Sequence, residues 1–136
     1  MFPSDDILGI IEPILINKGG KMITTDYNKL VRDLIVPSLG RRGVFSESRQ
    51  LSENEFRKAL DNKLDEEVAE FHEAVTLELP KEKQIEEIVD IISVLLTRAQ
   101  TLGCNKDELE IKIIAKEMDK GGFETRTFLI STTEQG

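Results

Sequence analysis

Four acidic residues on two apolar stretches of the chain could bind a cation. Glu67 and Glu70 stand three positions apart in the first stretch, and Glu87 begins the second. Asp90 follows Glu87 at the same spacing. On a helix, residues three apart point in the same direction. Ionised carboxylates are costly to bury unless they are paired or bind a metal. The two pairs therefore predict a compact cation site built from oxygen ligands.

The ligand chemistry narrows the choice of cation. Oxygen ligands favour Mg²⁺, Mn²⁺ or Ca²⁺ over Zn²⁺. A di-iron bundle needs Glu-x-x-His motifs, and the single histidine, His72, has Ala69 three positions before it. An EF-hand calcium loop is absent. We therefore expect Mg²⁺, with Mn²⁺ as a substitute, and Mg²⁺ usually binds substrate phosphates as well as carboxylates.

A simpler interpretation is that these acids belong to solvated helix faces, since acidic helices produce such spacings by chance. Asp90 fits that interpretation least. It lies between Val89 and Ile91, in a run of residues otherwise suited to burial, and aspartate is a mediocre helix former. We expect the remaining glutamates of the two stretches at the surface, namely Glu66, Glu78, Glu82 and Glu86.

Two long helices are predicted to carry the acids. Ser52 and Glu55 form a capping-box pattern, so one helix should run over about 53–79 and end before Pro80. A second helix is predicted over about 81–102. Consecutive helices with a short connection usually pack antiparallel. At about 1.5 Å of rise per residue, the two acid pairs then fall at similar heights and can converge.

Shorter elements are expected on either side of this hairpin. A helix over 26–36 would begin at Asp26 as N-cap and end at Pro37. A further helix over 106–120 would end at Gly121-Gly122. Its expected inward residues are Leu109, Ile113, Ile114 and Met118.

The last alternating segment, Phe123–Ile130, predicts a short strand that pairs with the segment near Val44. The expected fold class is thus mainly all-α: a helical bundle with an acid-bearing helical hairpin and a small terminal β-strand pair. Residues 1–22 are expected to be an N-terminal extension or translated leader, with Met22 as an alternative start. The domain would span 23–130, and 131–136 would be a frayed tail.

Composition excludes several classes of function. The net charge of −8 argues against a general surface for nucleic-acid polymers or anionic membranes, since both need clustered Lys and Arg. No apolar run approaches the roughly 20 residues that span a bilayer. The single cysteine, Cys104, suits a reducing cytosol, so we expect a cytoplasmic protein.

The acid motifs resemble those of the MazG-like all-α nucleoside triphosphate pyrophosphohydrolases, which include phosphoribosyl-ATP pyrophosphohydrolase. The superfamily pattern EExxE, a spacer and ExxD is matched by 66–70 and 87–90. YNKLVRDLI (27–35) and KEMDKGGFETRTFL (116–129) resemble segments of a house-cleaning subgroup. One departure is that Ile35-Val36-Pro37-Ser38 stands where that subgroup usually has Ile-Pro-Glu.

The resemblance implies a set of roles for the acids. Mg²⁺ would be held by Glu67, Glu70, Glu87 and Asp90. Glu66 would be an additional ligand or would hydrogen-bond to the groups that bind the metal. The implied reaction is hydrolysis of a nucleoside triphosphate between the α and β phosphates, which yields a monophosphate and pyrophosphate. Either Glu67 or Glu70 would accept the proton of the attacking water.

Phosphates also need positive partners, and three residues are candidates. They are Arg32, Lys63 and Lys120. Lys63 precedes Glu67 by one turn on the metal-bearing face, and Lys120 lies at a helix end beside two glycines. Arg32 could instead pair with a carboxylate.

Several alternatives remain open from the sequence. The helix around 85–99 is apolar nearly all round, which predicts a homodimer or higher oligomer. The rival enzyme is a phosphoribosyl-ATP pyrophosphohydrolase of histidine synthesis. A non-catalytic metal- or nucleotide-binding module, or an interaction protein, is the other rival.

Overall fold

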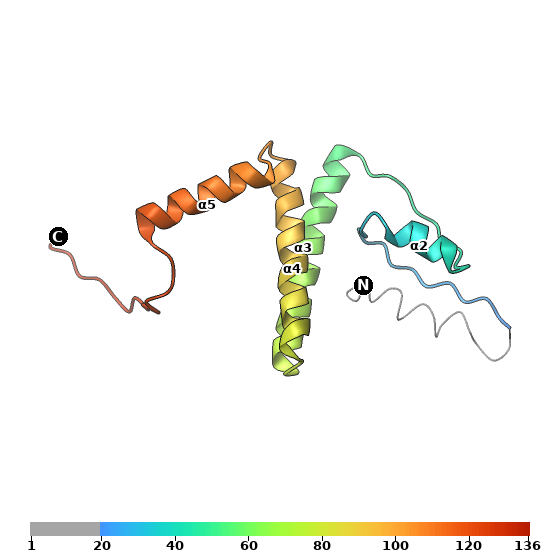
Figure 1. Cartoon of the computed structure of the whole chain (residues 1–136), viewed down its shortest axis with the longest axis horizontal. Coiled ribbons are helices and arrows are strands. Elements are labelled where there is room, and N and C mark those ends of the chain that lie inside the picture. Colours follow the sequence, from blue (N-terminus) through green and yellow to red (C-terminus); the bar gives the residue numbers. More distant parts are fainter. Residues whose placement is uncertain (1–19) are drawn as a thin grey trace.

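A central helical hairpin organises the chain. The computed structural model describes residues 20–136, and among these it forms α-helices and no strand. Figure 1 shows α3 and α4 at the centre, with α2 on one side and α5 on the other. The helix bounds are α2 Ile35–Arg41, α3 Glu53–Thr76, α4 Lys81–Gln100 and α5 Lys106–Lys120.

The start of α3 follows the predicted capping box. The Ser52 hydroxyl accepts a hydrogen bond from the backbone N–H of Glu55 at 3.3 Å. In return the Ser52 N–H donates to the Glu55 carboxylate at 3.0 Å. Two donors at the helix N-terminus, which would otherwise lack partners, are satisfied. The helix ends at Thr76, slightly before the predicted end, and Pro80 is the N-cap of α4.

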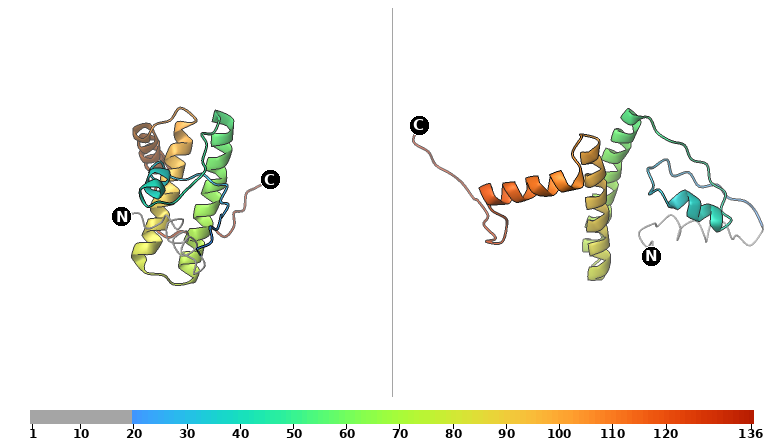
Figure 2. Two further views of the ribbon diagram at one scale, coloured as in Figure 1. Left: turned by 90° about the vertical axis from the view of Figure 1, so that its right-hand side faces the viewer. Right: turned by 45° about the horizontal axis from the view of Figure 1, so that its top comes forward.

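α3 and α4 pack side by side in opposite directions, as predicted (Figure 2). The buried apolar residues between them are few: Leu60, Ala74 and Val94. At the open end of the hairpin the Arg98 Nε donates to Asp61 at 2.7 Å and links the two helices. The hairpin thus holds the acid pairs at a common height with only a small apolar core.

The polarity of α4 is inverted relative to an ordinary surface helix. Its buried residues are Glu87, Asp90 and Val94. Its large apolar side chains are instead exposed, each by more than two fifths: Ile85, Ile88, Val89, Ile92 and Leu95. A single chain therefore does not cover the helix that the sequence suggested would be central.

The predicted helix over 26–36 is wrong. The chain is extended or turning up to Leu34, and the helix is α2, Ile35–Arg41. Asp26 does not cap it, and Leu34 is the N-cap. Pro37 does not end the helix because it lies in the first turn, where a missing N–H costs no hydrogen bond.

α2 forms a small apolar cluster with the segments that flank it. Ile35 and Leu39 are buried, and Tyr27, Val31 and Val44 pack against them. All five residues come from the part of the chain before α3. This entry segment, residues 27–44, therefore has its own local core and does not share that of the hairpin.

α5 has the predicted bounds, which are set by strong local signals. The Asn105 side chain accepts from the N–H of Glu108 at 2.9 Å, and Gly121 follows with φ of +82°, a conformation that glycine adopts without strain. The expectation that its apolar face points inward is wrong for Ile113, Ile114 and Met118, which are exposed. Leu109 is half-buried, and no residue of α5 is fully buried.

The predicted terminal strand pair is also wrong within the described residues. Phe123, Phe128 and Ile130 are almost fully exposed, and the segment after α5 lies on the opposite side of the hairpin from Val44 (Figure 1). A strand needs a neighbour for its backbone N–H and C=O groups. Because the hairpin stands between the two segments, neither can supply the other with those partners.

The expected N-terminal extension lies outside the described residues, apart from 20–22. At the other end, 131–136 are exposed and belong to no helix. No helix in the described part of the chain combines the length and apolar character that a membrane span requires.

Candidate metal centre

Three carboxylates converge in the middle of the hairpin. Glu67 and Glu70 come from α3 and Glu87 from α4, and one oxygen of each lies within 4.8 Å of the others. Glu67 and Glu87 are only 5% and 2% exposed, while Glu70 is half-buried. Antiparallel packing brings these predicted acids together, because equal distances from the turn place them side by side.

Asp90 is buried beside this trio, but its carboxylate already has a partner. The Arg32 Nη2 donates to Asp90 Oδ1 at 2.7 Å. Asp90 is 6% exposed, and its negative charge contributes to raising the pKa of Glu67. Of the two sequence alternatives for Arg32, the structure shows the ion pair with a carboxylate.

Lysine side chains form ion pairs with the acidic residues at and beside the trio. Lys63 Nζ lies 3.2 Å from Glu67 Oε1, and Lys29 binds Glu66 at 2.8 Å. On the other helix, Lys83 Nζ lies 3.1 Å from Glu87 Oε1. Lys83 was not predicted as a site residue, although it precedes Glu87 by four positions as Lys63 precedes Glu67.

The trio carries more negative charge than its neighbours balance. Burial, followed by the charges of Glu67 and Glu87, raises the pKa of Glu70 to about 8. Burial also raises the pKa of Glu67, although the ammonium group of Lys63 opposes this shift. Removing carboxylates from water and placing them together disfavours their ionised form.

A divalent cation fits these residues. Among the described residues, no hydrogen-bond donor reaches the buried Oε2 atoms of Glu67 and Glu87. Buried acceptors without partners are rare and costly. Hard cations such as Mg²⁺ take carboxylate oxygens and keep several waters, so these two oxygens and the half-buried Glu70 are suitable ligands.

The structure does not bring Lys120 to the site. Lys120 ends α5, which projects away from the hairpin (Figure 1). Its ammonium group lies 3.9 Å from the neighbouring Asp119, and its side chain is 70% exposed. Within one chain, Lys120 therefore lies apart from the carboxylate trio, and its phosphate contact stays a prediction.

Comparison with known proteins identifies the family. The family model described as phosphoribosyl-ATP pyrophosphohydrolase matches residues 44–117. No curated protein and no solved structure matched the chain. The family match covers more than half of the chain and includes the carboxylate trio and Asp90. The chain therefore belongs to the phosphoribosyl-ATP pyrophosphohydrolase family, within the MazG-like all-α superfamily that its motifs resemble.

Proposed function

We propose that this protein is a Mg²⁺-dependent hydrolase that cleaves nucleoside triphosphates between the α and β phosphates. The family supports a pyrophosphohydrolase activity. The observation that carries the proposal is the trio of carboxylates, two of which keep buried oxygens without a hydrogen-bond donor among the described residues. Such a site favours a cation that also binds phosphates.

The residues of the site have separable roles in this proposal. Glu67, Glu70, Glu87 and Asp90 would hold Mg²⁺, which when bound neutralises phosphate charge and acidifies a coordinated water. Glu70 is the candidate proton acceptor, because its carboxylate lies against those of Glu67 and Glu87 at the centre of the site. Its partial exposure also leaves it open to water.

Arg32 and Lys63 would bind the phosphates. Each now neutralises a carboxylate of the site, at 2.7 Å and 3.2 Å respectively. Once a divalent cation supplies that neutralising charge, both side chains can turn to an anionic substrate. Arginine suits this role because its planar guanidinium matches phosphate oxygens.

The substrate is best identified with a panel. Ordinary, oxidised and deaminated nucleoside triphosphates should be assayed beside phosphoribosyl-ATP, with Mg²⁺ and with Mn²⁺, by detection of pyrophosphate. We expect release from nucleoside triphosphates, in keeping with a house-cleaning role. Preference for phosphoribosyl-ATP would instead place the protein in histidine synthesis.

Asp90→Ala separates a metal-dependent enzyme from a plain interaction protein with a solvated acidic face. We expect loss of Mg²⁺ binding and activity with the fold retained, because Arg32 is about half exposed and can be solvated without its partner. Calorimetric titration with Mn²⁺, pyrophosphate release and circular dichroism measure the three properties. Glu110→Ala, an exposed change on α5, is the control.

Unchanged Mg²⁺ binding in Asp90→Ala would contradict the ligand set. If the wild-type protein bound a nucleotide with Mg²⁺ but released no pyrophosphate from any substrate, the non-catalytic alternative would be correct.

We also propose that the protein works as a homodimer. On α4, Ile85, Val89 and Ile92 are 57%, 52% and 49% exposed in a single chain. A contiguous apolar face of this kind is typical of an interaction site. Two hairpins that share their α4 faces would form a four-helix bundle.

A reducing cytoplasm suits the free thiol of Cys104.

A further inference from the structure

A pocket of about 180 Å³ continues from the carboxylate trio toward the turn of the hairpin. Glu70 and Glu87 belong both to the trio and to the wall of this pocket. Beyond them its wall is formed by the apolar residues Ala74, Leu77 and Leu79 and by the charged residues Glu73 and Lys83.

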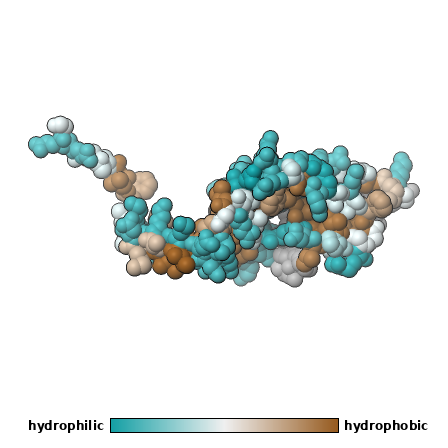
Figure 3. Space-filling model, turned by 90° about the horizontal axis from the view of Figure 1, so that it is seen from above, coloured by the Kyte–Doolittle hydropathy of each residue, from teal (hydrophilic) through white to brown (hydrophobic). Residues whose placement is uncertain are grey.

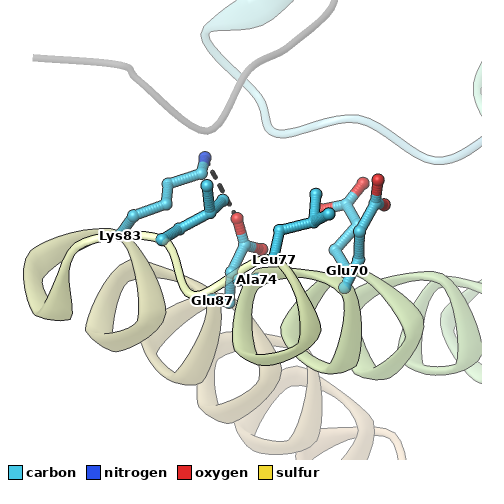
Figure 4. Close-up of a pocket in the computed structure, with 7 residues that line it drawn as sticks. Glu70, Ala74, Leu77, Lys83 and Glu87 are labelled. Atoms are coloured by element: carbon cyan, nitrogen blue, oxygen red, sulfur yellow. Dashed lines mark ion pairs between the residues drawn. The ribbon is translucent and has the colours of Figure 1, made fainter.

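The floor of this pocket can accept a flat apolar group. Ala74 is buried, while Leu77 is 60% exposed and free to contact a ligand. In Figure 4 the side chain of Leu77 rises from α3 on the same side as the carboxylate of Glu70. An exposed leucine by itself does not indicate a binding site. Leu77, however, lines the same pocket as Glu70 and Glu87 of the carboxylate trio.

The chemistry changes along α3 in a fixed order. Lys63 lies one turn before Glu67, and Leu77 lies two turns after Glu70, about 10 Å along the axis. The entry segment adds Arg32 to the cationic end. Cationic side chains thus lie on one side of the trio, and on the other the apolar residues Ala74, Leu77 and Leu79 lie together with Glu73 and Lys83. A nucleoside triphosphate has the matching order of phosphate anions, cleavable anhydride and planar base.

We infer that the pocket between Leu77 and Leu79 binds the nucleobase of the substrate, while the outer phosphates extend toward Lys63 and Arg32. This inference rests on the proposed function and adds the direction of the substrate in the site. The volume is smaller than that of a typical pocket for a whole ligand, so it holds the base and leaves the sugar near the solvent.

The apolar floor also determines how strictly the base is selected. A hydrophobic pocket distinguishes similar ligands only about 10- to 200-fold, far less than a pocket that hydrogen-bonds each edge. Ala74, Leu77 and Leu79 offer no side-chain donor or acceptor for reading a base edge. Glu73 and Lys83 do carry such groups, and Lys83 is paired with Glu87 at 3.1 Å. The ligand class is therefore nucleoside triphosphates whose base is selected mainly through apolar contacts.

The test compares ligands with and without a base. Full-length wild-type protein, Leu77→Asp and the control Leu102→Asp are titrated with α,β-methylene-ATP and with inorganic tripolyphosphate, in the presence of Mg²⁺. Leu102 is 73% exposed and lies after α4, at the other end of the hairpin from the pocket. Titration with Mn²⁺ alone monitors the metal site.

We expect Leu77→Asp to weaken binding of α,β-methylene-ATP about tenfold or more, since a buried leucine contact is lost and a charge faces the base. Binding of tripolyphosphate and Mn²⁺ should stay within about twofold of wild type. Lys63→Gln should weaken both phosphate ligands, because its site lies at the other end.

Unchanged nucleotide affinity in Leu77→Asp would overturn the inference and leave the proposed function intact. An equal loss of tripolyphosphate binding would overturn it as well, because the effect would then not concern the base. If the wild-type protein bound tripolyphosphate and Mn²⁺ but no nucleotide, both the inference and the proposed function would fail.

Discussion

At the scale of single residues, this protein keeps carboxylates close together where they repel each other. Glu67 and Glu87 are buried, and Glu70 meets both. The repulsion and the loss of hydration raise the pKa of Glu70 to about 8. Binding a divalent cation would relieve both costs, so the arrangement that weakens the metal-free fold favours the proposed metal site.

The raised pKa of Glu70 predicts how stability depends on pH without metal. Below the ordinary value of 4.5 the carboxyl is protonated in both states. Between 4.5 and about 8 only the unfolded state is ionised, so folding takes up a proton and stability falls as pH rises. Above about 8 the effect levels off.

Thermal unfolding in EDTA across this pH range measures the effect. We expect Glu70→Gln to flatten the fall in melting temperature, and we expect Mg²⁺ to stabilise the wild type most at the alkaline end. Glu110→Gln, at an exposed position, should behave as wild type. An unchanged slope in Glu70→Gln would show that another group causes the dependence.

At the scale of elements, the hairpin is built from strong local signals and the entry segment is attached to it by charges. The capping box fixes the start of α3. The entry segment has a separate apolar cluster, and two ion pairs join it to acids of the hairpin, Lys29 with Glu66 and Arg32 with Asp90. In the proposed metal site, the binding of metal and the position of this segment would therefore be linked through Asp90.

Ser52→Ala should lower the free energy of unfolding by about 1 kcal/mol, because the Glu55 N–H loses its acceptor. Urea denaturation measures this change. Binding of Mn²⁺ should not change, since Glu67 lies about four turns further along α3. Ser46→Ala, in the exposed loop before the cap, is the matched control, and an equal loss there would contradict the role of the cap.

Arg32→Gln should tighten the binding of Mn²⁺ several-fold. The substitution removes the guanidinium that competes with the metal for Asp90, and the negative charge of the buried carboxylate is then not compensated. Hydrogen exchange over residues 27–44 should become faster in the metal-free protein. Nucleotide hydrolysis should fall nevertheless, since the proposed phosphate contact is lost. Weaker binding of Mn²⁺ would show that Arg32 supports the site and does not compete for it.

At the scale of the whole molecule, apolar surface is left without cover. α4 turns Ile88 and Ile92 outward, and α5 buries no residue. Hydrophobic side chains are visible on the α5 side of the surface in Figure 3. Exposed apolar surface of this extent is typical of an interaction site, and in the proposed dimer a second copy would supply a hairpin of equal length with the same apolar face.

Ile92→Asp should therefore disrupt the proposed dimer. Ile92 is 49% exposed in a single chain, and a charge there would be buried at a shared α4 face without a partner. Sedimentation equilibrium should give twice the chain mass for wild type and a lower mass for Ile92→Asp. Phe45→Asp, at a residue 95% exposed in a loop, is the control, and a monomeric wild type would contradict the proposal.

The sequence was sufficient to predict the two helices of the hairpin and the bounds of α5. It was also sufficient to predict that Glu67, Glu70 and Glu87 converge. These features depend on local signals: capping side chains, glycine at helix ends, and the fixed rise per residue on either side of a short turn. Family membership was predictable for the same reason, since its motifs are local patterns.

Only the tertiary structure decided which groups meet across larger distances. Arg32 turned out to bind Asp90, and the helix expected over 26–36 moved to α2 because Ile35 and Leu39 pack with Tyr27. The position of Lys120 and the absence of a strand pair among the described residues follow from the direction of α5. The pocket at Leu77 needs both helices. Such contacts join residues far apart in the chain, and no local spacing specifies them.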